Sequence, residues 1–317
     1  MENYDFKKGL FYSILGSLLI SFQPIIAISR PDIIDPYIFG AVVALIEAII
    51  FLPIYLIERR NIKKLITNNP LNFEKYDLLL NGWKKRENIR LFIIIGVSFS
   101  FIPIFLYIGF EGAGAINSSL VMKIEIIFAL IFGNLILKEK INKIQILFCF
   151  LLFFGLILSV TQGSFDVLEL NMGVIILILT VLLFTVIHTL TKIGLEKKEI
   201  FSSQVVFIRN LMSGILLSST YFIFFPLKNI NILLNPENLI FFLLMGLDYG
   251  FSLFCWYKAL TYFQIGKITI IGSLTPIATA FFSFILLEEN FTWYHLFGTL
   301  IIIFAIIMIM REKEENQ

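Results

Sequence analysis

The fold class is decided by stretches such as residues 91–110, LFIIIGVSFSFIPIFLYIGF, which contain no charged side chain. A helix of this length crosses the hydrocarbon core of a lipid bilayer, because each residue adds about 1.5 Å. Similar runs recur along the 317-residue chain, which is 58% hydrophobic and only 15% charged. This composition argues against a water-soluble enzyme, a disordered chain and a nucleic-acid-binding protein, and it predicts an all-α integral membrane protein.

Charged and polar breaks divide the sequence into ten candidate transmembrane spans. The spans cover about residues 9–29, 36–57, 91–110, 115–136, 141–162, 172–193, 201–225, 238–262, 266–286 and 291–310. Lysines and arginines beside spans are mostly retained in the cytoplasm. If the N-terminus lies in the cytoplasm, Arg30 and Lys228 are the only basic residues in the outer connections between spans. The pattern predicts a multi-pass protein with both termini cytoplasmic. The abundance of Ile, Phe, Lys and Asn suggests an AT-rich genome and hence a prokaryote, so we expect the protein in the plasma (inner) membrane.

One connection, residues 58–90 on the predicted cytoplasmic side, is long. Its segment from Leu71 to Trp83 mixes apolar and charged side chains. Such a mixture is typical of a helix in the membrane interface, and it also fits a solvated loop. Both alternatives stay open at the level of sequence.

A shift of 150 residues aligns the third to fifth spans with the eighth to tenth without a gap. It places Tyr107 on Tyr257, and the Leu-x-Glu motif of residues 137–139 on that of residues 287–289. Matches among Ile, Leu and Phe are common by chance in so apolar a chain. The shared frame of a tyrosine and a Leu-x-Glu motif is more informative, and it predicts an internal repeat.

Five spans per repeat is an odd number, so the two halves must cross the membrane in opposite directions. We expect a first repeat over residues 1–162, with helices 1–5 and the cytoplasmic loop 58–90, and a second over residues 163–317, with helices 6–10. A shift of 162 residues places Glu47 on Arg209. Inverted halves suit a transporter, because exchanging their conformations creates two states that open one central site to each side in turn.

Short motifs recur in the same order in both halves. They are Tyr257-Lys258-Ala259-Leu260, Thr275-Pro276 and Leu287-Glu288-Glu289, with the counterparts Tyr107-Ile108-Gly109-Phe110, Glu125-Ile126 and Leu137-Lys138-Glu139. With these motifs the chain resembles the drug/metabolite transporter superfamily, specifically the ten-span EamA-type members made of two five-helix repeats. Arg209 stands where family members often carry an arginine, and Lys192 matches a basic residue that often closes the sixth span.

Three positions depart from the family pattern. They are Phe22-Gln23-Pro24 in place of a Trp-Gly pair, Ile126 in place of a proline, and Glu47 in place of a first-half arginine. The resemblance implies a cavity at these positions, lined mainly by spans one to four and six to nine, with spans five and ten peripheral. Family substrates include amino acids, other metabolites and drugs, usually moved outward with proton coupling or in exchange. The departures mean that the substrate cannot be carried over from the family.

Charged side chains deep within spans are costly unless they face a cavity or a partner. They are Glu47, Lys123, Glu125, Arg209, Asp248 and Lys258. Each is a candidate for substrate binding or coupling, and each can equally be a clamp between helices. Lys258 is near the inner end, so its amine is expected to reach the interface. His188 can relay protons, although a hydrogen-bonded packing histidine is the simpler interpretation.

Helical geometry orders these candidates further. Lys123 and Glu125 are two residues apart, hence about 200° apart around a helix axis. We expect Lys123 to face the cavity and Glu125 to meet a neighbouring helix. Arg209 and Asp248 lie on successive antiparallel spans about 9 Å apart in depth, within reach of an ion pair that can be structural or part of a substrate site.

Aromatic and amide side chains complete the candidate list. Tyr249 and Trp256 flank Asp248 and can stack on an organic cation or an aromatic substrate, although lipid-facing packing explains most aromatics in this chain. Gln23 precedes Pro24, which frees a backbone carbonyl within the first span. No metal or redox spacing links Cys149 and Cys255.

We therefore expect a secondary active transporter, an exporter of a small organic metabolite such as an amino acid, that works by alternating access with proton coupling or exchange. In this interpretation Lys123 or Arg209 attracts a substrate carboxylate, while Glu47, Glu125 or Asp248 changes protonation. Multidrug efflux of lipophilic cations is one alternative. An intramembrane enzyme or receptor is another, for which no catalytic motif is found. The expected partners are the substrate and the lipid bilayer, with a homodimer left open, and no cofactor, metal or nucleic acid is predicted.

Overall fold

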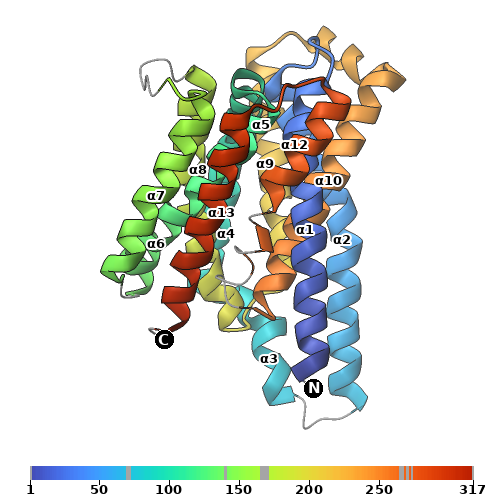
Figure 1. Cartoon of the computed structure of the whole chain (residues 1–317). Coiled ribbons are helices and arrows are strands. Elements are labelled where there is room, and N and C mark those ends of the chain that lie inside the picture. Colours follow the sequence, from blue (N-terminus) through green and yellow to red (C-terminus); the bar gives the residue numbers. More distant parts are fainter. Residues whose placement is uncertain are drawn as a thin grey trace.

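The computed structural model describes residues 2–68, 73–138, 141–164, 171–263, 268, 271–272 and 274–315. Within these ranges the chain is helical and contains no β-strand. The long helices run side by side, and the two termini lie at the same end of the bundle (Figure 1). The prediction of an all-α protein is confirmed.

The first half of the chain supplies α1 to α7. The bounds are α1 Glu2–Ser29, α2 Pro36–Asn68, α3 Phe73–Asn81, η2 Gly82–Lys84, α4 Arg86–Ala113, α5 Ala115–Val121, η3 Met122–Ile124, α6 Glu125–Leu137 and α7 Lys143–Val160. The predicted fourth span is thus interrupted by η3, a short 3₁₀ turn. Asn142 begins α7 with a capping box, in which its side chain and that of Gln145 each accept a backbone N–H hydrogen bond.

The second half follows the same order. Its bounds are α8 Met172–Glu196, α9 Ser202–Phe224, η5 Leu227–Leu234, α10 Pro236–Leu260, α12 Thr275–Leu286 and α13 Trp293–Glu315. Asn171 and Asn235 cap α8 and α10 by accepting hydrogen bonds from backbone N–H groups. Glu139, and most of residues 264–273 at the start of the predicted ninth span, lie outside the described residues.

Among the residues that the structure describes, eight helical segments are long and apolar enough to cross a membrane. Two shorter apolar helices, Thr275–Leu286 and Trp293–Ile309, fall within the last two predicted spans. The chain is therefore a multi-pass membrane protein. The long helices agree with the predicted spans to within about five residues, except that α1 begins at Glu2 and α2 continues to Asn68.

The long connection of residues 58–90 is mostly helical. Residues 73–84 form α3 and η2, so this segment is helical and the loop alternative is wrong, while its place in the membrane interface stays a prediction. α3 lies at the end of the bundle that carries both termini (Figure 1). Gly82 packs directly on Glu199 with no room for a side chain, which ties this connection to the one between α8 and α9.

The predicted repeat is visible in the helix boundaries. α10, α12 and α13 each begin 150 residues after α4, α6 and α7, respectively. The packing of the helices shows the same correspondence. α2 packs on its counterpart α9, and α7 packs on its counterpart α13. α1 packs on α10, and their respective counterparts α8 and α4 also pack on each other. Exchanging each helix for its counterpart returns the same pairs. The two halves therefore interlock about an approximate two-fold axis.

Small residues let α10 approach α2 closely. Gly246 lies against Ile46, and Gly250 lies against Phe51 and Glu47, with no free space for a side chain at either glycine. The Gly-x-x-x-Gly spacing of α10 therefore serves helix packing, as such motifs commonly do in lipid. It also brings α10 beside Glu47, one of the candidate residues.

Candidate functional site

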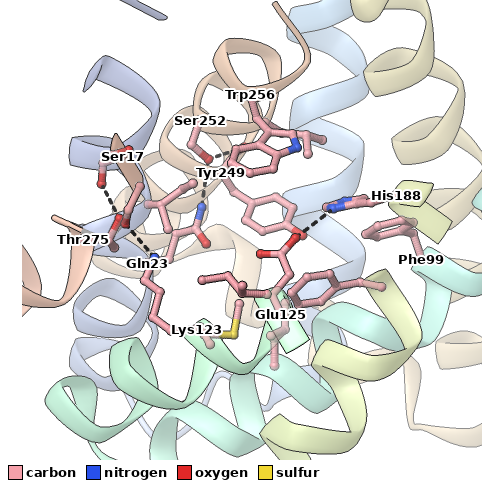
Figure 2. A pocket seen from close by; sticks show the side chains of 17 residues that line it. Ser17, Gln23, Phe99, Lys123, Glu125, His188, Tyr249, Ser252, Trp256 and Thr275 are labelled. Atoms are coloured by element: carbon pink, nitrogen blue, oxygen red, sulfur yellow. Dashed lines mark hydrogen bonds and ion pairs between the residues drawn. The ribbon is translucent and has the colours of Figure 1, made fainter. Parts of the chain in front are cut away.

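A cavity of about 110 Å³ lies between the two halves of the bundle (Figure 2). Both repeats contribute walls, which come from α1, α4, η3, α6, α8, α10 and the start of α12. Its polar lining residues are Ser17, Gln23, Lys123, Glu125, His188, Ser252 and Thr275, and its aromatic ones are Phe99, Phe184, Tyr249 and Trp256. A buried water needs about 10–15 Å³, so the cavity has room for a small organic solute.

The cavity forms where helices are interrupted at equivalent positions of the repeats. The turn Met122–Ile124 separates α5 from α6, and α12 begins at Thr275, the counterpart of Glu125 at the start of α6. Interrupted helices offer free backbone groups, which transporters use to bind substrates within the membrane. Lys123 donates a hydrogen bond from Nζ to the carbonyl oxygen of Gly272 over 2.7 Å. The two interruptions thus meet at the cavity.

Lys123 lines the cavity and Glu125 meets the neighbouring helix α8 at His188, as expected. Glu125 lines the cavity as well, so the expectation that it lies outside the cavity is wrong. That expectation assumed a regular α-helix through both residues. The 3₁₀ turn ends at Ile124, between the two side chains, and its tighter winding changes the angle between them. An ammonium and a carboxylate therefore border the same space (Figure 2).

Glu125 faces His188, with 3.8 Å between Oε1 and Nδ1. The imidazole ring packs against Phe99, Phe184 and Tyr257. Neither ring nitrogen of His188 has a hydrogen-bond partner in the described part of the chain. The predicted packing is therefore confirmed, and the predicted hydrogen bond is wrong. The pair places an acid beside a base in the cavity wall.

The wall formed by α1, α10 and α12 carries neutral polar groups. Gln23 donates from Nε2 to Ser252 Oγ over 2.9 Å, and Ser252 donates to the carbonyl oxygen of Tyr249 over 2.9 Å. The Thr275 hydroxyl donates to the carbonyl oxygen of Ser17 at 3.5 Å. The three hydroxyl residues were not among the predicted candidates. The only signal of Ser17 and Ser252 in the sequence is a hydroxyl group within an otherwise apolar span, whereas Thr275 belongs to the Thr275-Pro276 motif.

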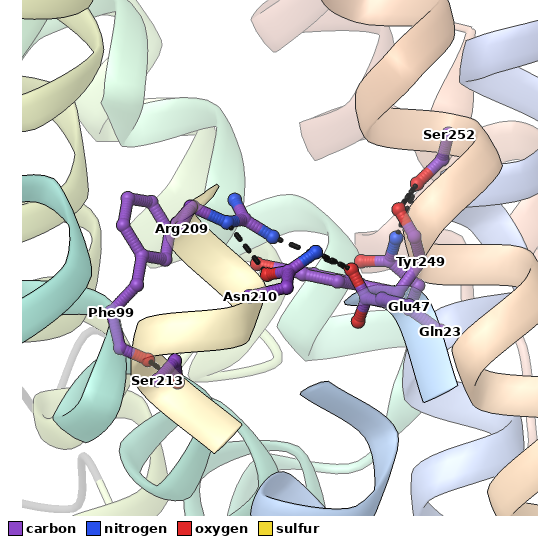
Figure 3. Close-up of polar contacts among 8 residues, drawn as sticks. All are labelled: Gln23, Glu47, Phe99, Arg209, Asn210, Ser213, Tyr249 and Ser252. Atoms are coloured by element: carbon purple, nitrogen blue, oxygen red, sulfur yellow. Dashed lines mark hydrogen bonds and ion pairs between the residues drawn. The ribbon is translucent and has the colours of Figure 1, made fainter. Parts of the chain in front are cut away.

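A second polar group, the buried cluster, comprises Glu47, Arg209 and Asn210 (Figure 3). Arg209 Nη2 lies 3.6 Å from Glu47 Oε2, and Arg209 Nε donates to Asn210 Oδ1 over 2.9 Å. Asn210 donates from Nδ2 to the same Glu47 oxygen over 2.5 Å. The side chains of Glu47 and Arg209 are 2% and 1% exposed, so this ion pair is shielded from solvent.

Two aromatic rings lie between the buried cluster and the cavity. The Arg209 guanidinium carbon is 4.2 Å from the ring centre of Phe99 and 5.3 Å from that of Tyr249. Both rings line the cavity, whereas Glu47 and Arg209 do not. A cation on an aromatic face is stabilised by the ring's electron density. The two rings therefore hold Arg209 in place and separate it from any solute.

The predicted ion pair between Arg209 and Asp248 is wrong, because Arg209 pairs with Glu47. The prediction considered only spans adjacent in the chain, whereas α9 packs mainly along α2. Glu47 and Arg209 are equivalent positions of the two repeats, so they meet where α2 and α9 pack about the two-fold axis. Asp248 is 7% exposed, and its Oδ2 has no hydrogen-bond partner among the described residues.

Comparison with protein-family models gives a match to the EamA-like transporter family over residues 7–161 and 171–311. The chain belongs to this family. The resemblance drawn from the sequence motifs is thereby confirmed. The match falls in two segments, one in each half of this EamA-family chain.

Two curated relatives carry only general names. An uncharacterized transporter of Methanothermobacter thermautotrophicus is 26% identical over 216 residues, covering 66% of this chain and 60% of the relative. The uncharacterized transporter YyaM of Bacillus subtilis is 30% identical over 97 residues, covering 29% of this chain and 32% of the relative. The chain thus matches less than two thirds of either relative's length.

One solved structure, described only as the crystal structure of a protein, superimposes with a TM-score of 0.64. The superposition covers 99% of this chain and 98% of that one, at 10% sequence identity. At this identity the likeness concerns the fold alone. It shows that the helical arrangement of this EamA-family chain recurs over a whole experimentally determined chain.

Ion pairs join helices at the end of the bundle that carries the termini. Lys258 Nζ lies 2.5 Å from Glu58 Oε1, and Ser203 donates to the other oxygen of that carboxylate. Lys258, expected to reach the interface, is therefore held by a partner on α2. Glu58 was not predicted, because the predicted second span ends one residue before it.

Glu199 organises the connection between α8 and α9 at this same end. Its carboxylate accepts hydrogen bonds from Lys85 over 2.5 Å and from Asn88 over 2.7 Å. These hydrogen bonds hold the pKa of Glu199 below its ordinary value. The start of α4 is thereby fastened to the second half.

At the opposite end, Arg30 closes the connection between α1 and α2. It forms an ion pair with Glu111 at the end of α4 and donates to the carbonyl oxygens of Ala27 and Ile34. Its side chain is 2% exposed. A basic residue in a predicted outer connection is thus explained by structural hydrogen bonding.

Glu289, from the repeated Leu-x-Glu motif, joins the halves at this opposite end. Its Oε2 accepts a hydrogen bond from the backbone N–H of Ile116, near the start of α5, over 3.0 Å. Burial raises the pKa of Glu289, and the backbone N–H groups of Ile116 and Ala115 oppose that rise. The carboxylate therefore caps a helix of the other repeat.

The structure divides the predicted candidates into two sets. Five of them line the cavity, namely Gln23, Lys123, Glu125, Tyr249 and Trp256. Three do not line it and are buried, namely Glu47, Arg209 and Asp248. In the described part of the chain, no three His, Cys, Asp or Glu side chains gather in a way that can hold a metal ion.

Proposed function

We propose that the chain is a secondary active transporter with ten membrane-spanning segments, arranged as two inverted five-helix repeats over residues 1–162 and 163–317. The family match, the eight long apolar helices with two shorter ones, and the exchangeable packing pairs support this architecture. Inverted repeats put the substrate site at their interface. The cavity between the two halves is therefore the proposed transport site.

The proposed orientation has both termini in the cytoplasm and the chain in the plasma (inner) membrane of a prokaryote. Both termini lie at one end of the bundle (Figure 1), and the connections at that end are rich in lysine and arginine. Cytoplasmic loops carry such an excess.

The proposed solute is a small organic zwitterion such as an amino acid. The observation that carries this proposal is that the Lys123 ammonium and the Glu125 carboxylate border one cavity. Lys123 attracts a carboxylate and Glu125 attracts an ammonium. Tyr249 and Trp256 offer an apolar surface for the rest of the solute.

Transport requires the cavity to open to each side in turn. Arg30 pairs with Glu111 at one end of the bundle, and Lys258 pairs with Glu58 at the other. We expect these two pairs to break alternately as the halves exchange conformations. In the proposed direction the solute is loaded from the cytoplasm and exported, with proton coupling or in exchange for another solute.

Ligand-induced stabilisation of the purified protein tests the solute class. We expect amino acids to raise the Tm, since a ligand at 100 times its Kd adds about 2.7 kcal/mol to the unfolding free energy. Lys123→Met and Glu125→Gln should each abolish that rise. Lys64→Met and Glu87→Gln, which make the same changes at exposed positions, should keep it. A panel of amino acids that leaves the Tm unchanged contradicts the proposed solute.

Multidrug efflux of lipophilic cations is the second candidate. It is favoured by the aromatic rings that surround Glu125 in the cavity. The two candidates differ at Lys123, because a zwitterion needs the ammonium, whereas a cation is repelled by it. Tighter binding of a cationic dye by Lys123→Met, together with loss of binding by Glu125→Gln, would select efflux of cations.

A further inference from the structure

We propose that Asp248 holds the coupling proton of this transporter, in a buried carboxyl site shared with Glu47 and Arg209 and separate from the solute cavity. That this proton is coupled to solute transport rests on the proposed function. The site itself rests on the packing of α2, α9 and α10 around these side chains.

The buried region contains two acidic side chains and one arginine. Glu47 has a counter-ion and a hydrogen-bond donor at Oε2, because Arg209 lies 3.6 Å from this atom and Asn210 donates to it. Asp248 directly precedes Tyr249, whose ring contacts the Arg209 guanidinium, and lies two residues before Gly250, which packs on Glu47. It is 7% exposed, and its Oδ2 has no partner in the described part of the chain.

Charge balance decides which carboxyl group carries the proton. A carboxylate without a counter-charge is costly at this depth, whereas a protonated carboxyl group is neutral. Arg209 and Asn210 stabilise an anion at Glu47, whereas the Oδ2 atom of Asp248 has no hydrogen-bond donor among the described residues. The cluster is therefore balanced when Glu47 and Arg209 are ionised and Asp248 is protonated.

The other groups around the site do not supply the missing charge. The titratable or charged ones are Glu47 on α2, Tyr107 on α4, Arg209 on α9, and Tyr249 and Tyr257 on α10. α1 contributes the neutral Gln23, and η5 adds no charged group among its described side chains. Phenol groups are neutral and guanidinium groups are charged throughout the physiological pH range. The two carboxyl groups are thus the ones that exchange protons there.

Phe99 and Tyr249 connect the proton site to the cavity. Each ring contacts the Arg209 guanidinium and also lines the cavity, and Tyr249 follows Asp248 in α10. A solute that displaces these rings frees Arg209 to turn towards Asp248. The Asp248 proton then passes to water on the open side, and Arg209 is shared between the Asp248 and Glu47 carboxylates, so that water stabilises the one negative charge that the cluster gains. Solute and proton are linked without touching.

Infrared difference spectroscopy tests the proton site without any solute. The sample is the purified full-length protein in lipid vesicles at neutral pH. A protonated carboxyl group gives a carbonyl stretching band that a carboxylate lacks. We expect Asp248→Asn to remove such a band and Glu125→Gln, the same change in the cavity wall, to leave that band in place. A spectrum that Asp248→Asn leaves unchanged overturns the proposal.

Glu47→Gln provides a second variant with a distinct expectation. With Glu47 neutral, Arg209 lacks a counter-ion, so Asp248 should ionise and its carbonyl band should disappear although Asp248 is still present. A band that persists in Glu47→Gln shows that Asp248 does not share Arg209, which also overturns the proposal. This variant keeps the test decisive if Asp248→Asn fails to fold.

Transport in proteoliposomes tests the coupling, with radiolabelled L-leucine as the probe. We expect Asp248→Asn to lose accumulation driven by a pH gradient and to retain leucine–leucine exchange, because the amide imitates the protonated carboxyl group. Gradient-driven accumulation that survives in Asp248→Asn contradicts the proposal. If the unmodified protein does not move leucine, the proposed solute fails for leucine, and the infrared result alone decides the proton site.

Discussion

The cavity group of Lys123, Glu125 and His188 and the buried cluster around Glu47 and Arg209 differ in what surrounds their charges. In the cavity, the side chains of Glu125 and His188 are 30% and 20% exposed and lie 3.8 Å apart. In the buried cluster, the side chains of Glu47 and Arg209 are 2% and 1% exposed and pair with each other. Charges open to a cavity are free to bind a ligand, whereas charges that satisfy one another hold helices together. The packing partner, rather than the type of residue, decides between the two tasks.

The largest effect is expected from Arg209→Met, which removes the positive charge of the buried cluster. Leaving Glu47 without its counter-ion should lower the free energy of unfolding by about 3–5 kcal/mol. Denaturant unfolding in detergent micelles measures this loss. The double variant with Glu47→Gln should be more stable than Arg209→Met alone, because it removes both charges together. A double variant that is less stable than Arg209→Met alone would contradict the ion pair.

Gly250→Leu should disturb the buried cluster through packing. The added side chain collides with Phe51 and Glu47, and overpacking of this kind costs about 1–3 kcal/mol. The Tm of the purified variant measures the effect. Leu243→Ala, at an exposed position of the same helix, serves as the control and should be nearly neutral. Equal shifts for both variants would show that α10 does not pack on α2 at Gly250.

Lys123→Met should reverse the pattern of the buried cluster, with a small change in stability and a large change in binding. The lost hydrogen bond to the Gly272 carbonyl costs about 1 kcal/mol, while binding of amino acids should be abolished. Comparing the Tm without ligand and the ligand-induced shift separates the two quantities. A variant as unstable as Arg209→Met would assign Lys123 to structure instead.

The smallest effect concerns acid sensitivity at Glu199. Its pKa is lowered in the folded protein by hydrogen bonds from Lys85 and Asn88. The contribution of Glu199 to the free energy of unfolding is therefore complete at pH values above its pKa in the unfolded chain, and it is lost as the pH falls through its pKa in the folded protein. Lys85→Met should therefore make the fall of Tm below about pH 4.5 shallower. Lys85 is half-exposed, which limits the effect to below about 1 kcal/mol. Lys64→Met is the control, and equal slopes for all three proteins would contradict the role of Lys85.

Most of the fold could be predicted from the sequence, because apolar length dictates a membrane-spanning helix. The spacing of 150 residues that separates Tyr107 from Tyr257 also separates the first residues of three pairs of helices. The interruption at Met122–Ile124 could not be predicted, because no proline or glycine marks it. Its consequence, that Lys123 and Glu125 share a cavity, was missed for the same reason.

The partner of Arg209 shows what pattern reasoning lacked. Glu47 and Arg209 were recognised as equivalent positions of the repeat, yet the ion pair was assigned to Asp248, the neighbour along the chain. Equivalent positions near a two-fold axis necessarily approach each other, and α2 packs on its own counterpart α9. Symmetry was therefore the signal that could have identified the pair. Ser17 and Ser252 carry a weaker signal, since hydroxyl residues are common in membrane helices that face no cavity. Thr275 is marked by its Thr275-Pro276 motif.

The central claim is that one cavity, at the interface of the two halves, opens to each side of the membrane in turn. The most direct measurement uses Met122→Cys in the cavity wall, in a chain whose Cys149 and Cys255 are replaced by alanine. A membrane-impermeant maleimide is applied to right-side-out and inside-out vesicles, with Lys64→Cys in the same chain as a one-sided control. The account predicts labelling of Met122→Cys from both sides, slowed in both cases by a solute that stabilises the protein. Labelling from one side only, in every condition, would contradict it.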